Sequence, residues 1–309
     1  MLVPVDRAFG ERFLTSIDDF YAHGVHLLFN EWWESAPAGV VDKYVAALEA
    51  DPQIAELARE AWYAEPLDVD ALEDCAPGTL GHAYREFMVS NDLMEHLAEG
   101  YRDLHEQFAA SGKLDRMPAI LKYKVLRGYQ THDLHHVLTG YPATPLGELG
   151  LQAFQLAQVE FPYSAMWVSV VAGHMAYVDP WLIKPAMDSI THGWAYGREA
   201  RSIQFVKFET MFDRPLEEVR AEYRLGRDCS GVSDLPSAAA PELLRPSGGG
   251  QVLTPLAGPP FPLDGLPAEL APIVGLAGEQ DGIVPAAQDV AASRDPFRVR
   301  RLAKQGGQH

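Results

Sequence analysis

The segment from residue 119 to residue 158 constrains this chain most, because it reads as two helices joined by a tight break. The first helical pattern runs from Ala119 to Thr139 and should stop there, since Gly140 is a natural helix-ending residue and Pro142 cannot continue a helix. Pro145 is well suited to the first position of a new helix, which the pattern extends to Gln158. The first turn of the second helix should therefore face back across the joint.

Four side chains that commonly bind metal ions lie around this break: His132, Asp133, His136 and Glu148. His132 and His136 are four residues apart, so a helix stacks them one turn above the other on one face, as in the zincin motif. Asp133 can reach the same ion from the flank. Two imidazoles with carboxylates are a usual mixed nitrogen and oxygen site, although such a histidine pair also occurs in solvated helices. The residues alone leave zinc, iron, magnesium and manganese open.

Three other histidines and one glycine are not counted as metal ligands. His135 points about 100° away from His136, so we expect it to pack or to face solvent. Gly128 lies one turn before His132 on the motif face, where a missing side chain leaves room either for a ligand or for a close helix contact. His23 and His26 also lie in a helical pattern, but nothing nearby completes a metal site.

Helical periodicity recurs along most of the chain, and no convincing run of alternating strand residues occurs before residue 226. The predicted fold is all-α, a multi-helix globular bundle. The segment Ser164 to Tyr177 is apolar on nearly all sides and is expected to be the most buried helix, or one that faces lipid. Further patterns cover residues 12–33, 40–62, 79–88, 91–98, 103–110, 185–205 and 216–225.

The composition changes after Asp228, where prolines arrive at short intervals and Gly248 to Gly250 form a glycine run. We therefore predict an all-α domain over residues 1–226 and a Pro/Gly/Ala-rich, mostly irregular tail over residues 227–309. The last residues carry several arginines, and a solvated end is favoured over attraction to anionic lipid or to a neighbouring chain.

Composition narrows the function classes. An apolar content of 47% indicates a globular core, and a net charge of −18 argues against binding nucleic acid through its phosphates. Cys75 and Cys229 are too few and too far apart for a disulfide framework or a cysteine-based zinc site. No signal peptide, transit peptide or long apolar stretch is recognised, so a bacterial cytoplasmic protein, or one peripheral on the inner membrane, is expected.

The motif His-Asp-x-x-His, eleven further residues and then Glu148 resembles the signature of the ubiquinone (coenzyme Q) biosynthesis protein 4 family. The stretch from Pro77 to Gly81, the segment around Leu146 and the segment from Gly197 to Arg220 look like further landmarks, so the resemblance covers about residues 40–226. The chain is similar to a bacterial member. The resemblance implies a divalent metal ion, commonly assigned as zinc, at His132, Asp133, His136 and Glu148, with iron or manganese as alternatives.

Three functions follow as expectations. The resemblance implies, first, a metal-dependent C1 decarboxylation and hydroxylation of a polyprenylated hydroxybenzoate, with Asp133 either a ligand or a base. The apolar helix from Ser164 to Tyr177 would then line a groove for the prenyl-lipid tail. Second, the chain is a non-catalytic prenyl-lipid-binding scaffold that organises other quinone-biosynthesis enzymes at the membrane surface. Third, it is a His-Asp type metal phosphohydrolase using His82 or His105 and Asp179. Homo-oligomer formation is left open.

Overall fold

The computed structural model describes residues 4–20, 25–37, 39–60, 70–91, 93 and 112–229, and the statements below concern these residues. All of them lie in one compact unit, and a second unit, Leu244–Ser293, contains none of them. His23, His105, the patterns at 92–98 and 103–110 and all but the first three residues of the predicted tail lie outside the described residues.

The described residues form helices joined by short connections, and the one β-type contact among them is an isolated bridge between Thr79 and Pro215. The all-α prediction is confirmed. In chain order the elements are α1 (Arg7–Asp18), α2 (Val25–Ser35), α3 (Val40–Ala50), α4 (Pro52–Glu60), η1 (Asp70–Asp74), α5 (Leu80–Ser90), α7 (Lys113–Arg116), α8 (Ala119–Thr139), α9 (Pro145–Val159), α10 (Pro162–Val178), η2 (Pro180–Leu182), α11 (Ile183–Glu199), η3 (Phe208–Met211) and α12 (Leu216–Glu222), where η marks a 3-10 helix.

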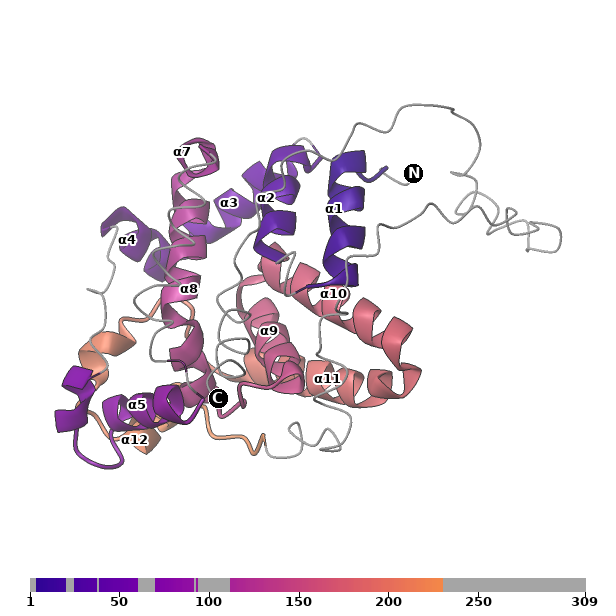
Figure 1. Cartoon of the computed structure of the whole chain (residues 1–309). Coiled ribbons are helices and arrows are strands. Elements are labelled where there is room, and N and C mark those ends of the chain that lie inside the picture. The colour runs from indigo at the N-terminus through magenta and orange to yellow at the C-terminus, as the bar shows by residue number, and fades with distance from the viewer. Residues whose placement is uncertain are drawn as a thin grey trace, which may run out of the picture. The chain divides into compact units, whose positions relative to one another are not determined.

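Helix α8 is the element on which the others depend. Helices α3, α4, α5, α9 and α12 all contact it, and Figure 1 shows it running through the middle of them. Its residues are buried around most of its circumference, including the charged Lys124 and Arg127. A helix that is covered on nearly all sides acts as a rigid core element.

Helices α9 and α11 approach each other unusually closely (Figure 1). A Cβ atom built on Gly193 of α11 would lie 2.1 Å from the backbone oxygen of Gly150 in α9, and one on Gly197 would lie 2.3 Å from the oxygen of Phe154. Since real side-chain atoms do not approach a backbone oxygen so closely, only glycine fits at these two positions. The pair of glycines therefore sets the distance between α9 and α11.

Three expectations about helices are wrong in detail. The pattern at residues 12–33 is divided between α1 and α2, because Asp19 is extended and ends α1. The pattern predicted to end at residue 205 ends at Glu199, because Ala200 is extended and Arg201 bonds to the backbone of Tyr223 instead. Helix α10, expected to be the most buried helix or one that faces lipid, is not the most buried: its C-terminal end carries Tyr177, which is 89% exposed, and its contact with lipid stays a prediction.

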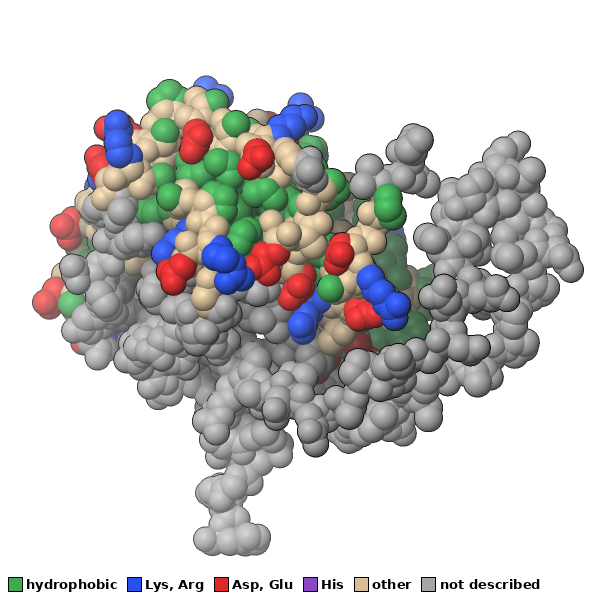
Figure 2. Space-filling model, turned by 90° about the horizontal axis from the view of Figure 1, so that it is seen from above, with side chains coloured by type: hydrophobic (Ala, Val, Ile, Leu, Met, Phe, Trp, Pro, Cys, Tyr) green, Lys and Arg blue, Asp and Glu red, His purple; other side chains and the backbone are tan. Residues whose placement is uncertain are grey.

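Seen from above, acidic and basic side chains are interspersed over the described part of the surface, with hydrophobic side chains between them (Figure 2). The acidity of the chain is therefore not gathered in one patch on that face. Among the described residues, no helix has both the length and the apolar character needed to cross a membrane.

Candidate metal centre

The break between α8 and α9 is built as the residues predict. Gly140 ends α8 in the left-handed conformation at φ 84°, and its N–H donates to the carbonyl oxygen of His136 at 2.8 Å. The hydroxyl of Thr144 accepts a hydrogen bond from Gly147 at the start of α9, and Pro145 occupies the first turn. Glu148 is consequently held in the first turn of α9, opposite the end of α8.

Three of the predicted ligands converge. The Nε2 atoms of His132 and His136 lie 3.2 Å apart, His136 Nε2 lies 2.9 Å from Glu148 Oε1, and His132 Nε2 lies 3.3 Å from Glu148 Oε2. Ligand atoms about 2.0–2.1 Å from a tetrahedral ion lie ~3.3 Å from one another, so these separations match the edges of such a coordination shell. His132, His136 and Glu148 thus form a triad that fits a divalent metal ion.

The ring of His136 is fixed so that one nitrogen faces the other two ligands. His136 Nδ1 lies 3.0 Å from the carbonyl oxygen of Tyr141, which can only accept a hydrogen bond, so Nδ1 carries the proton. In a neutral imidazole Nε2 then has a lone pair, and it points at another imidazole nitrogen and a carboxylate oxygen. Phe87 of α5 stacks on the ring at 5.5 Å. Lone pairs that converge in this way need a cation or a shared proton between them.

The electrostatics of the triad favour positive charge beside Glu148. Burial alone would lower the pKa of His132, but the charge of Glu148, its hydrogen bond and the charge of Asp133 together raise that pKa to about 9. Burial likewise opposes ionisation of Glu148, yet His136 and His132 hold the pKa of Glu148 well below its ordinary value. The carboxylate is therefore ionised, and a divalent ion would take the place of the bound protons.

Asp133 does not join the triad: the three ligand atoms that gather within 4.8 Å come from His132, His136 and Glu148. Its charge acts both on His132 and on Tyr84, whose pKa is raised first by burial and then by Asp133. His135 is buried and lies 3.2 Å from the amide nitrogen of Gln155, so it packs in the core as expected.

His82 and Asp179, which the phosphohydrolase alternative would use, also lie outside the triad, and His105 lies outside the described residues. His82 forms a half-exposed pair with Glu86 on α5, at 3.5 Å. Asp179 accepts a hydrogen bond from the backbone of Trp181 and so caps η2. Neither residue has the role that this alternative would give it.

Sequence reasoning missed a buried ion pair that fixes α8 near the triad. Arg127 is 1% exposed and donates to both carboxylate oxygens of Glu209, at 2.5 and 2.7 Å, and to the carbonyl oxygen of Val206. Such a two-pronged contact fixes both position and rotation. The partners are 82 residues apart, so no local pattern could have revealed the pair.

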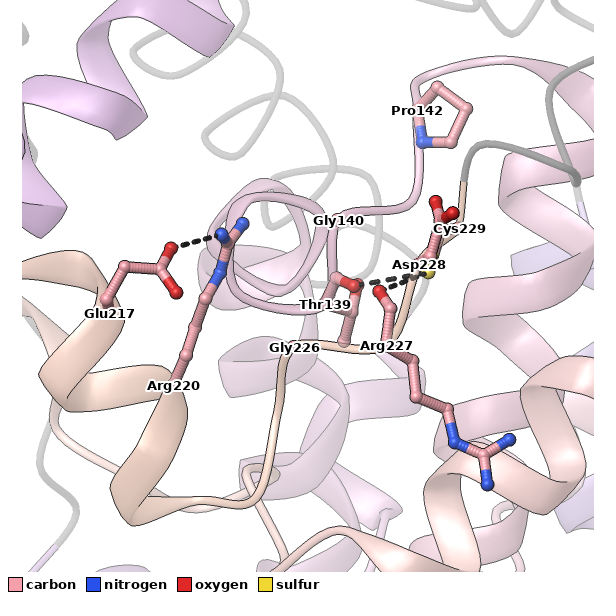
Figure 3. Close-up of a pocket in the computed structure, with 9 residues that line it drawn as sticks. All are labelled: Thr139, Gly140, Pro142, Glu217, Arg220, Gly226, Arg227, Asp228 and Cys229. Carbon is pink, nitrogen blue, oxygen red and sulfur yellow. Dashed lines mark hydrogen bonds and ion pairs between the residues drawn. The ribbon is translucent and has the colours of Figure 1, made fainter.

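A pocket of about 350 Å³ lies at the C-terminal end of α8, and none of the triad residues lines it. Arg220 of α12 donates to the carbonyl oxygens of Val137 and Leu138, which satisfies the end of the helix. It also pairs with Glu217 (Figure 3). The thiol of Cys229 donates to the carbonyl oxygen of Thr139 at 3.3 Å (Figure 3). These contacts hold the end of α8 but supply no reactive group, because burial raises the pKa of Cys229 to about 11.

Comparison with known proteins agrees with this geometry. The model of the family described as coenzyme Q (ubiquinone) biosynthesis protein Coq4 matches residues 118–228, which contain the whole triad. The family resemblance is confirmed. Residues 118–228 are therefore similar to the Coq4 family, and the matches to curated relatives cover 50% to 57% of the chain.

Two relatives illustrate the extent of the similarity. The mitochondrial ubiquinone biosynthesis protein coq4 of Botryotinia fuckeliana is 24% identical over 162 residues, which cover 50% of each chain. The mitochondrial COQ4 homolog of Bos taurus is 24% identical over 177 residues, which cover 57% of this chain and 62% of that one. This chain thus matches between half and two thirds of these relatives' length.

A solved structure has a similar fold to this chain. The crystal structure of a protein from Nostoc punctiforme PCC 73102, named for ubiquinone biosynthesis, superposes with a TM-score of 0.55. The superposition covers 74% of this chain and 96% of that one at 23% identity, which supports the fold alone.

Proposed function

We propose that the chain is a metal-dependent enzyme of ubiquinone biosynthesis that removes the ring carboxylate of a polyprenylated hydroxybenzoate and hydroxylates the same carbon. The observation that carries this proposal is the convergence of three ligand atoms at His132, His136 and Glu148. The tautomer of His136, fixed by Tyr141, leaves Nε2 free for an ion. The Coq4 resemblance supplies the pathway, and the reaction itself is our inference.

His132, His136 and Glu148 would hold the ion, which we expect to be zinc, with iron or manganese as alternatives. When bound, a divalent ion would supply a Lewis acid for the substrate carboxylate or the adjacent phenol oxygen. The hydroxylation is a two-electron oxidation and needs dioxygen as oxidant, which iron or manganese could organise and zinc could not; with zinc the proposed chemistry is limited to the decarboxylation. The chain's own groups do the positioning: Glu148 balances the positive charge, and Tyr141 and Phe87 orient His136. Asp133 lies beside His132 but outside the triad, so we propose it as a proton acceptor.

The runner-up is a non-catalytic prenyl-lipid-binding scaffold with a structural metal. The number of protein ligands separates the two functions, since structural zinc sites are closed by four protein ligands and catalytic sites keep one position open. In the described part of the chain the cluster supplies three ligands, and the side chains of His132 and Glu148 are 26% and 23% exposed. An ion there would have an open position that reaches solvent, which favours chemistry.

The lipid substrate implies an apolar wall and access to a membrane surface. Helix α10 supplies Met166, Val170, Val171 and Met175, which are buried against its neighbours. At its far end Tyr177 and Trp181 are 89% and 86% exposed. Large amphipathic rings at this exposure are typical of membrane interfaces. We therefore propose a bacterial cytoplasmic protein that is peripheral on the inner membrane, working beside other quinone-biosynthesis enzymes.

Elemental analysis of purified protein tests the metal. We expect about one ion per chain in the wild type and loss of that ion in His132→Ala and Glu148→Ala. His82→Ala is the matched control, because it removes a half-exposed histidine outside the triad. In cells that lack their own family member, only the wild type and His82→Ala should restore ubiquinone.

The outcomes separate the three functions. Restored ubiquinone in a folded Glu148→Ala protein that has lost its metal would refute the catalytic site and favour the scaffold. Loss of metal in His82→Ala would favour the phosphohydrolase arrangement. A wild type that carries no metal would contradict the proposal altogether.

A further inference from the structure

Tyr141 connects the metal triad to helix α11. Its backbone lies in the break between α8 and α9, where its carbonyl oxygen accepts a hydrogen bond from His136 Nδ1 at 3.0 Å. Its side chain is buried and extends to α11, where the hydroxyl lies 2.6 Å from Nδ1 of His192. Two hydrogen bonds therefore lead from a triad ligand through one residue to His192.

The ring of Tyr141 is packed against both α9 and α11. A Cβ atom built on Gly150 of α9 would lie 2.5 Å from Cε1 of this ring, so the ring lies directly on the helix backbone. The ring centres of His192 and Tyr196 in α11 lie 5.7 and 6.2 Å from that of Tyr141. Because close packing holds a ring in one orientation, the hydroxyl has a single place, beside His192.

His192 is the strong hydrogen-bonding partner of this hydroxyl. The thiol of Cys229 also lies within hydrogen-bonding reach, but it donates its proton to the carbonyl oxygen of Thr139. A thiol sulfur is a weak acceptor, whereas a neutral imidazole nitrogen is a good one. Burial first, and then the charge of Arg227, lower the pKa of His192, so its imidazole is neutral at pH 7. The hydroxyl of Tyr141 therefore donates to Nδ1 of His192.

His192 stands on a part of α11 that is held very close to α9. It precedes Gly193, whose added Cβ atom would lie 2.1 Å from the backbone oxygen of Gly150. Helix α9 carries Glu148 two residues before Gly150. The contact that places the carboxylate ligand thus also places the imidazole that holds Tyr141.

We propose that His192 is a positioning residue of the metal triad, which holds the Tyr141 hydroxyl and thereby fixes the peptide group whose carbonyl oxygen orients His136. The inference rests on the proposed function, because it requires that the triad binds a metal ion. Loss of the outer partner of a ligating histidine typically lowers metal affinity about 10–100-fold. Since His192 acts through the side chain of Tyr141, we expect the lower end of this range.

The test measures the zinc affinity of the full chain by competition with a chromogenic chelator. His192→Phe keeps an aromatic ring beside Tyr141 but removes the acceptor, and it should weaken zinc binding about tenfold. His192→Asn places an amide oxygen near the former position of Nδ1 and should restore most of the affinity. His174→Phe is the matched control, because His174 of α10 also uses Nδ1, to bond the backbone oxygen of Ile17 outside the triad. It should bind zinc like the wild type.

Tyr141→Phe removes the other half of the same hydrogen bond by deleting one oxygen atom, and it makes the same test if His192→Phe does not fold. It should weaken zinc binding about as much as His192→Phe. The double variant should be no weaker than either single variant, because all three lack the same hydrogen bond. Losses that multiply in the double variant would contradict the proposed connection between His192 and His136.

The visible absorption of the cobalt(II)-loaded chain separates positioning from simple stabilisation. Its bands report the geometry of the ligands, so they should shift in His192→Phe and Tyr141→Phe but stay in place in His192→Asn and His174→Phe. A lower thermal midpoint of His192→Phe with unchanged zinc affinity and cobalt spectrum would overturn the inference and leave the proposed metal site intact. A wild type that binds neither zinc nor cobalt would refute the metal-dependent function, and the inference with it.

Discussion

His136 and Lys124 are both buried nitrogen bases on α8, but their surroundings differ. His136 is held by the carbonyl oxygen of Tyr141, the ring of Phe87 and the carboxylate of Glu148. Lys124 meets two phenylalanine rings and has no carboxylate beside it. A paired charge is stabilised in the folded protein, whereas an unpaired one is destabilised relative to the unfolded chain. Stability should therefore depend on pH in a way that can be assigned to Lys124.

The prediction concerns Lys124→Met. The pKa of Lys124 is about 7 in the folded protein and about 10.4 in an unfolded chain, so the unfolded state binds more protons between these values and stability rises with pH. Burying the amine costs most near or below pH 7, and the cost disappears above about pH 10.4. Lys124→Met should thus be more stable than the wild type at pH 7, and the difference should shrink toward pH 10.

Thermal unfolding from pH 6 to pH 10 measures this difference, with Lys122→Met as the control that should show no such trend. A constant gap between Lys124→Met and the wild type across this range would mean that packing, and not the charge of the amine, determines the effect.

At the scale of helices, the triad depends on how α9 is held. Glu148 lies two residues before Gly150 on α9, and Gly150 is the residue whose backbone oxygen meets Gly193 of α11. The close contact of the two helices therefore fixes the helix that presents the carboxylate ligand. Any increase in the distance between α9 and α11 should therefore displace Glu148 from the two histidines.

We predict that Gly193→Ala destabilises the fold by about 1–3 kcal/mol or more. The new Cβ atom would lie 2.1 Å from the backbone oxygen of Gly150 and 3.1 Å from the Cβ atom of Ala153, and neither of these atoms belongs to a flexible side chain that could move away. Metal affinity should fall as well. Gly173→Ala in α10 is the matched control, since its new atom would lie 3.4 Å from the end of the Ile17 side chain. Equal thermal midpoints for the two variants would show that the α9–α11 contact can relax freely.

The same elements show what the sequence could and could not predict. The end of α8 and the start of α9 follow from Gly140, Pro142 and Pro145, whose backbone preferences act locally. The end of α11 does not, because Arg201 bonds to Tyr223, which is distant in sequence. Asp133 was included as a ligand although a neighbour on a helix points about 100° away, the argument already applied to His135.

Contacts between residues that are distant in the chain also could not be predicted from the sequence. Arg127 and Glu209 are 82 residues apart, and Lys124 reads as an ordinary surface lysine until Phe161 and Phe205 are seen around it. Buried charges of this kind arise from tertiary packing and have no local signature.

For the whole molecule, the exposed end of α10 raises the question of how a protein with a net charge of −18 meets a membrane. Anionic lipid would repel such a chain, so attraction must come from apolar and aromatic insertion. Tyr177 and Trp181 stand at the turn between α10 and α11, and Lys184 beside them is also well exposed. This turn is the part of the described chain best suited to lie in the headgroup region.

The prediction is that the protein sediments with vesicles of neutral phospholipid, and that Tyr177→Ser combined with Trp181→Ser lowers this binding about tenfold or more, since each large side chain contributes about 1.5–3 kcal/mol when buried. Trp194→Ser is the control, because Trp194 lies on α11 away from the turn and is only 40% exposed. Binding should persist at high salt, as insertion does not depend on counter-charges. Binding that requires anionic lipid and is lost at high salt would instead assign the membrane contact to basic residues. It would contradict a role of Tyr177 and Trp181 in membrane binding.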